Sequence, residues 1–151
     1  MRCGKGIFYS TMIIVFLIAV SSCGGRKAGN FRDIEDGKWS YGDEIVLACD
    51  SGGHNEEMAV ALRYNDRYPY RTITLRVILT DKQGEETIDT LTIELNDENG
   101  KRLGHGMGGS YQIEKVSHLI FPTDSCTVTL SHVMKEATVE GIEMVGVLCN
   151  K

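Results

Sequence analysis

The sequence predicts an all-β protein: a single antiparallel β-sandwich, immunoglobulin-like or jelly-roll-like, with seven or eight strands. Several segments alternate apolar and polar residues with a period of two, and turn-forming residues separate these segments. No window after residue 22 shows the period of about 3.6 residues that an amphipathic helix requires. The 151 residues, of which 42% are hydrophobic and 25% are charged, suffice for one domain plus a processing segment.

The first 22 residues are typical of a secretory signal peptide. Arg2 and Lys5 precede the apolar run 12–20, which as a helix would span about 13 Å and could not cross a bilayer core of about 30 Å. Val20-Ser21-Ser22-Cys23 then resembles the bacterial lipobox, in which the cysteine is diacylated and becomes the first residue. We therefore expect cleavage after residue 22 and a membrane anchor on Cys23. Ordinary cleavage, with Cys23 an unmodified thiol, is the alternative.

Residues 23–38 are expected to form a lipidated flexible tether, and residues 39–150 the sandwich domain. The stretch 24–30 contains three glycines and has no periodicity. No aspartate follows Cys23 to indicate retention at an inner membrane, and no acidic run follows it to indicate export to the cell surface. We expect a lipid-anchored protein of the outer membrane that faces the periplasm.

The strands of the sandwich are predicted one by one from apolar runs and alternation. The candidates in chain order are 44–49, 58–64, 72–80, 90–95, 116–121, 126–132 and 142–149. The alternation is clearest in 72–80, where every second residue from Ile73 to Leu79 is apolar, as in a half-buried antiparallel strand. Turn signals are found at 65–66, 81–84, 96–100 and 122–125.

Charge and motifs argue against several classes of function. The formal net charge is −5, so we expect no nucleic-acid partner. Gly104–Gly109 matches G-x-G-x-x-G, but no helix start follows it, and we interpret it as a glycine-rich loop. Asn96–Gly100 lacks the ligands of an EF-hand, and the four histidines lie far apart in the sequence. We expect no metal site, no cofactor, no catalytic residue and no enzyme activity, and we interpret His132 as a satisfied core or edge histidine.

Three cysteines remain after Cys3 is cleaved off and Cys23 is lipidated. Cys49, Cys126 and Cys149 allow at most one internal disulfide, and the sequence does not choose among the three pairings. Three small buried thiols on strands are an equally good expectation.

The segment 62–70 combines aromatic and cationic residues where a loop would otherwise be merely polar. Arg63, Tyr64, Tyr68, Pro69 and Tyr70 are candidate partner-binding residues, because tyrosine and arginine are common interface anchors. Pro69 cannot donate a ladder hydrogen bond, which places the segment at a strand entry or an edge. The alternative is that the tyrosine rings cap one end of the sandwich.

The chain resembles the gliding motility-associated lipoproteins of the GldH type. The resemblance is carried by 39–43 (Trp-Ser-Tyr-Gly-Asp), Leu62-Arg63, Tyr68-Pro69-Tyr70, Asp89-Thr90, Gly100, Gly104, Gly106, His132-Val-Met134 and 141–146. It covers most of the expected mature chain in the right order. The chain departs from the family pattern at Arg71-Thr72, Leu103, Ser125-Cys126 and Lys135.

The resemblance implies a non-catalytic cell-envelope lipoprotein linked to surface gliding and protein secretion. Such a protein would act as an assembly or scaffold component and would contact envelope proteins. The family carries no catalytic residues over to this chain. A second hypothesis is a glycan-binding surface or periplasmic module, since exported β-sandwiches often carry aromatic platforms.

Overall fold

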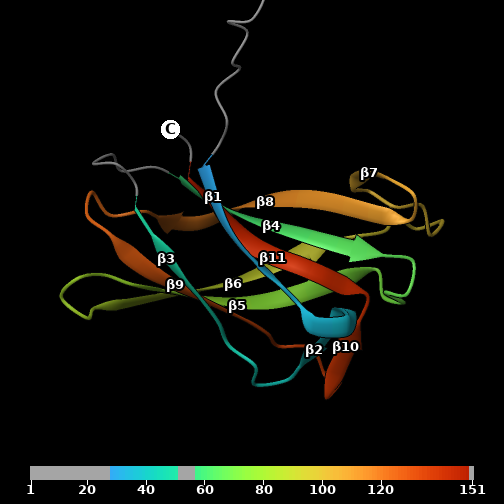
Figure 1. Cartoon of the computed structure of the whole chain (residues 1–151), viewed down its shortest axis with the longest axis horizontal. Helices are drawn as coiled ribbons and strands as arrows, with labels where there is room; N and C mark the ends of the chain where they lie inside the picture. Colours follow the sequence, from blue (N-terminus) through green and yellow to red (C-terminus); the bar gives the residue numbers. More distant parts are fainter. Residues whose placement is uncertain (1–27, 51–56, 150–151) are drawn as a thin grey trace, which may run out of the picture.

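The computed structural model describes residues 28–50 and 57–149, which form β-strands and a single turn of 3-10 helix (Figure 1). The strands are β1 (Ala28–Asp33), β2 (Lys38–Ser40), β3 (Ile45–Cys49), β4 (Glu57–Asn65), β5 (Thr72–Thr80), β6 (Glu86–Glu94), β7 (His105–Met107), β8 (Ser110–Ile120), β9 (Cys126–His132), β10 (Thr138–Glu140) and β11 (Ile142–Cys149), and the 3-10 turn η1 is Glu35–Gly37. Every strand pair is antiparallel, which confirms the predicted all-β class.

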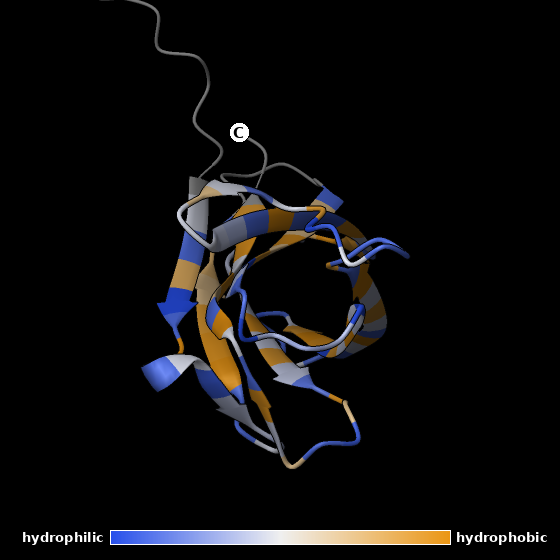
Figure 2. Cartoon of the chain, turned by 90° about the vertical axis from the view of Figure 1, so that its right-hand side faces the viewer, coloured by the Kyte–Doolittle hydropathy of each residue, from blue (hydrophilic) through white to orange (hydrophobic). Residues whose placement is uncertain are grey.

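The strands form two main sheets that pack face to face. One sheet has five strands in the order β1-β11-β4-β8-β7, and the other has four in the order β3-β9-β5-β6. A two-stranded ribbon of β10 and β2 lies at one end (Figure 1). Viewed from the side, the strands surround a common interior, and hydrophobic residues concentrate in them (Figure 2). The predicted sandwich is therefore confirmed.

The core is built from the alternating faces of the central strands. On β5 the residues Ile73, Leu75, Val77 and Leu79 are buried while their neighbours are more exposed, as the period of two predicts. On β4 the inward residues run from Met58 to Tyr64, and they meet the inner face of the other sheet in one continuous cluster. Apolar contact between the two sheets thus supplies the main stabilisation of the domain.

The ordered domain begins earlier than predicted. β1 lies inside the expected tether 23–38 and pairs with β11 from Ala28 to Asp33. Phe31 packs over Gly146, where an added Cβ would lie 2.3 Å from the ring. A strand that is held by its backbone pairing and one ring needs no hydrophobic alternation, which explains why the sequence pattern missed it. Cys23, the signal peptide and residues 23–27 lie outside the described part of the chain.

Four of the eleven strands that the structure describes lie outside the seven predicted segments. They are β1, β2, β7 and β10, of which β2, β7 and β10 have three residues each. β8 also begins at Ser110, earlier than the predicted 116, and its pairing with β4 shifts register near Glu57. Within residues 28–50 and 57–149, no helix is long and apolar enough to cross a membrane.

Candidate functional site

Two of the predicted site residues, Tyr64 and Tyr68, lie in the core. Their relative exposures are 0% and 1%. The Tyr64 hydroxyl donates to the Leu95 carbonyl at 2.6 Å and accepts from the Gly104 amide at 3.0 Å. The Tyr68 hydroxyl donates to the Thr72 carbonyl at 2.8 Å, and burial raises the pKa of Tyr68. These two rings cap the end of the sandwich, so the expectation that they face a partner is corrected.

A tight turn explains why the chain buries these rings. The Tyr68 amide donates to the Asn65 carbonyl at 3.1 Å, and the Arg67 amide donates to the Asn65 side chain at 3.0 Å. Gly141 lies against this turn with φ of +86°, and a Cβ there would be 2.3 Å from the Tyr68 nitrogen. The turn therefore packs against a glycine that no other residue can replace without movement.

Arg102 joins the turn to the glycine-rich loop, and sequence reasoning did not single it out. Its guanidinium donates to the Asn96 side-chain oxygen at 2.8 Å and to the backbone carbonyls of Tyr68 and Asp66 at 3.3 and 3.2 Å. It also lies about 6 Å from the ring centres of Tyr64 and Tyr111. Its partners come from segments far apart in the sequence, so no local pattern could have indicated it.

The remaining predicted residues are accessible. Arg63 and Pro69 are exposed and Tyr70 is half-buried, with its ring edge-on to Tyr68 at 5.6 Å. Arg63 lies on the outer face of β4 and donates to the Gln112 side chain of β8 at 3.4 Å. Contact between these three residues and a partner stays a prediction.

Glu143 organises the polar surface beside Arg63. Its carboxylate accepts from the Ser110 hydroxyl at 2.6 Å and from the Asn65 side-chain amide at 2.8 Å. These two hydrogen bonds lower the pKa of Glu143, and Arg63 and Arg67 add to the effect. The carboxylate thus stays ionised and holds the ends of β4, β8 and β11 together.

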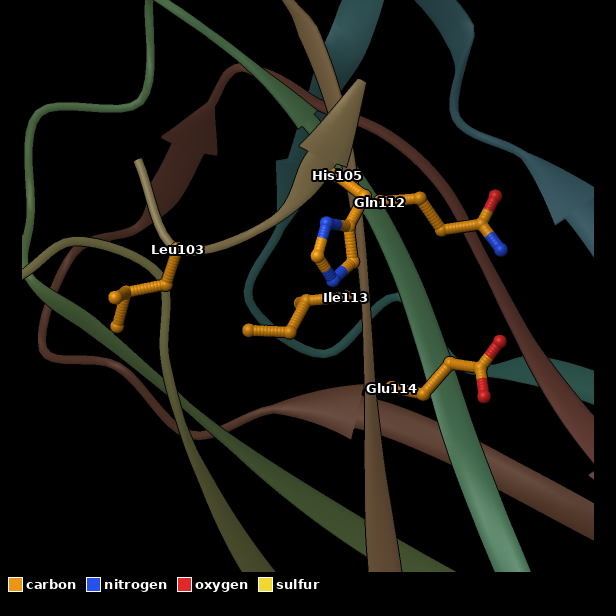
Figure 3. A pocket seen from close by; sticks show the side chains of 5 residues that line it. All are labelled: Leu103, His105, Gln112, Ile113 and Glu114. Carbon is orange, nitrogen blue, oxygen red and sulfur yellow. The ribbon is translucent and has the colours of Figure 1, made fainter. Parts of the chain in front are cut away.

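An open cleft of about 530 Å³ lies where β7 begins beside β8. We call it the edge cleft, and its lining residues are Leu103, His105, Gln112, Ile113 and Glu114. Leu103 and Ile113 extend to one side, Gln112 and Glu114 extend to the other, and the His105 ring lies between them (Figure 3). Arg63 adjoins the edge cleft, because its guanidinium donates to the side chain of Gln112, which lines the cleft. Apolar and polar groups side by side suit binding of a protein or other polymer.

The described residues bear on the predictions of no metal site and of a satisfied core histidine. Among them, no group of three His, Cys, Asp or Glu side chains is placed to hold a metal ion. His132 is buried, as predicted, against the edges of Trp39 and Tyr41. The expectation that it is satisfied is corrected, because neither ring nitrogen has a hydrogen-bond partner in the part of the chain that the structure describes.

Residues 27–148 match the family model described as GldH lipoprotein. The chain belongs to the GldH lipoprotein family. The match spans the described domain from β1 to β11, which confirms the resemblance noted in the sequence. No curated protein is similar enough to count as a relative.

Several solved structures are similar to this chain at low sequence identity. A family 35 carbohydrate-binding module from Clostridium thermocellum is 8% identical, with 80% of this chain and 97% of that chain covered and a TM-score of 0.46. The cycloalternan-forming enzyme from Listeria monocytogenes is 14% identical, with 87% and 10% covered and a TM-score of 0.47. A non-crystalline cellulose specific module, CBM28, is 12% identical, with 86% and 75% covered and a TM-score of 0.44. This chain spans only a tenth of the Listeria enzyme, and such likeness does not extend to ligands.

Proposed function

We propose that this GldH-family protein is a non-catalytic assembly or scaffold component of the cell envelope. A lipid on Cys23 would hold it at the periplasmic face of the outer membrane, where it would contact other envelope proteins. The observation that carries the proposal is the family match over 27–148, which includes every described strand. On this proposal the protein would act in surface gliding and in the linked secretion machinery.

The edge cleft together with Arg63 is the surface that we assign to the partner. It combines an exposed arginine, a histidine, two further polar side chains and two apolar ones on neighbouring strands. This mixture resembles the composition of non-obligate protein interfaces, which are about as apolar as the rest of a protein surface. Tyr70 and Pro69 lie beyond it on the turn that Arg102 holds, so the predicted exposed residues could extend the same contact.

Site-specific photo-crosslinking in cells tests this role. A photo-reactive phenylalanine replaces His105 in the edge cleft, and a matched variant carries it at Val46, which is 51% exposed on the other sheet. We expect the His105 position to capture a defined envelope protein and the Val46 position to capture none. Equal crosslinking at both positions, or none at His105 in gliding cells, would contradict the assignment.

Glycan binding is the alternative that the sequence left open. The rings of Tyr64 and Tyr68 are buried, so they cannot provide the aromatic platform on which that alternative depended. Protease treatment of intact cells separates the two roles, because a periplasm-facing scaffold would be spared and a surface glycan receptor would be degraded. Degradation in intact cells would therefore count against the proposed location.

A further inference from the structure

Cys49 and Cys126 lie directly opposite each other on neighbouring strands. β3 and β9 lie side by side (Figure 1). Cys49 is the last residue of β3, Cys126 is the first of β9, and the antiparallel register pairs them. Side chains of directly opposed residues project from the same face of a sheet, with Cα atoms about 4.5–5.5 Å apart. A disulfide accepts Cα separations of about 4.4–6.8 Å, so the register suits one.

Both side chains point into the same part of the core. Their relative exposures are 3% and 6%, and they belong to one hydrophobic cluster. They also line a cleft of about 400 Å³, together with polar residues such as Asp81 and Lys82. The two cysteines are therefore close to each other and open on one side to a surface cleft through which an oxidant can approach.

The strand register does not place Cys149 opposite either of these two cysteines. Cys149 lies on β11, whose neighbours are β1 and β4 in the five-stranded sheet, and its backbone partner is Ala28. A bond from Cys149 to Cys49 or Cys126 would have to cross from one sheet to the other. Only the pair Cys49 and Cys126 is joined by strand pairing.

We propose that Cys49 and Cys126 form a cross-strand disulfide after export. Cys49 and Cys126 are not joined by a disulfide in this structure, so formation requires an oxidant, which we take to be an exported dithiol–disulfide oxidoreductase. One thiolate attacks the disulfide of the oxidant and releases one of its sulfurs as a thiolate. The second cysteine thiolate then attacks the mixed disulfide, which forms the Cys49–Cys126 bond. Overall the two cysteine thiols lose two protons and two electrons, and the oxidant takes up both and leaves as a dithiol.

Trypsin separates the three cysteines, which makes the pairing directly measurable. Cleavage after Lys and Arg places Cys49 in 39–63, Cys126 in 116–135 and Cys149 in 136–151. The full chain is extracted from membranes with an alkylating reagent present during lysis, digested without reductant and examined by mass spectrometry. We expect a linked pair of 39–63 and 116–135 that disappears on reduction. Alkylated Cys49 and Cys126, or a link to 136–151, would overturn the proposal.

Thermal unfolding with and without reductant gives a second measurement. The bond would close a long loop, so reduction should lower the melting midpoint of the wild-type protein by on the order of 10 °C. Cys149→Ser should keep this sensitivity to reductant, whereas Cys126→Ser should melt at the reduced midpoint in both conditions. Insensitivity of both the wild type and Cys149→Ser to reductant would show that no such bond forms.

Discussion

Arg102 connects three parts of the chain that meet at one end of the sandwich. Its guanidinium binds the turn after β4 through backbone oxygens and binds Asn96, whose own amide donates to the Tyr70 carbonyl at 2.9 Å. The side chain is 19% exposed, so these hydrogen bonds are partly shielded from water. A planar fork with five donors can serve several acceptors at once, which an ammonium group cannot.

We therefore predict that Arg102→Ala lowers the free energy of unfolding by about 2 kcal/mol. Arg102→Lys should recover only a small part of that loss. Arg71→Ala is the matched control, because Arg71 is half exposed and its ion pairs with Glu94 and Glu98 measure 3.7 and 3.8 Å. Its loss should cost less than about 0.5 kcal/mol. Urea unfolding checks both values, and equal costs for the two arginines would refute the role of Arg102.

Buried His132 couples the stability of the fold to mildly acidic pH. Burial lowers its pKa, and the nearby backbone of Trp39 and Ser40 offsets this only in part. The folded pKa thus lies below the unfolded value of about 6.5, so the unfolded chain binds a proton first as the pH falls. The stability that neutral His132 contributes is complete above about pH 6.5 and is lost as the pH falls below it.

His132→Phe should remove this part of the pH dependence, because phenylalanine fills the space beside Trp39 without a titrating group. We expect the melting midpoint of the variant to fall less than that of the wild type between about pH 7 and 5.5. Carboxylates whose pKa values are lowered in the fold, such as Asp89 and Glu143, lose their contribution at lower pH in both proteins. Parallel pH profiles would refute the assignment.

The long strands could be predicted from the sequence and the short ones could not. β5 and β9 bury every second residue along their length, and β6 does so only at Leu91 and Ile93, so this alternation is visible without a structure. β2, β7 and β10 have three residues each, too few for any period, and they form only because a longer neighbour or a turn positions them. The candidate site depends on these short elements, so its geometry was hidden in the sequence.

Contacts between the two main sheets could not be predicted from the sequence either, because the residues that make them lie far apart along the chain. Asp89 on β6 accepts from the Ser117 hydroxyl at 2.9 Å and the His118 amide at 3.1 Å on β8. Burial opposes ionisation of Asp89, but these hydrogen bonds outweigh it and lower its pKa. Asp89 thereby connects β6 of the four-stranded sheet to β8 of the five-stranded sheet. The sequence marked Asp89 only as part of the family resemblance, and the structure supplies its physical role.

Gly141, in the turn between β10 and β11, lies directly against the backbone of Tyr68. Gly141→Ala adds a Cβ 2.3 Å from a backbone nitrogen and forces an alanine to φ near +86°. Gly84→Ala is the matched control, since its φ is +82° but nothing lies within 4 Å. We expect a cost of about 1 kcal/mol at Gly84 from backbone strain alone and at least about 3 kcal/mol at Gly141. Chemical denaturation of the two variants measures the difference, and similar costs would show that the turn yields easily.

The position of β1 determines how the whole domain would sit on a membrane. Only five Cα–Cα steps separate Cys23 from Ala28, so a lipid on Cys23 would lie at most about 18 Å from the start of β1. β1 and β7 are opposite edges of the five-stranded sheet, about 19 Å apart at the usual strand spacing. The short connection would therefore keep the domain close to the bilayer, while the edge cleft lies on the sheet edge farthest from the anchored strand.

The expected lipid anchor on Cys23 can be tested by substitution of that residue. Cys23→Ala should move the protein from the membrane fraction to the soluble periplasm and abolish labelling by a fatty-acid analogue, because several acyl chains are needed for stable attachment. Cys3→Ala is the matched control, since Cys3 lies in the segment that we expect cleavage to remove, and it should leave labelling and fractionation unchanged. The melting midpoint of Cys23→Ala protein should equal that of the wild type, because the domain begins after the substituted residue. Persistent membrane association and labelling of the Cys23→Ala protein would mean that the chain is held by something other than a lipid at this position.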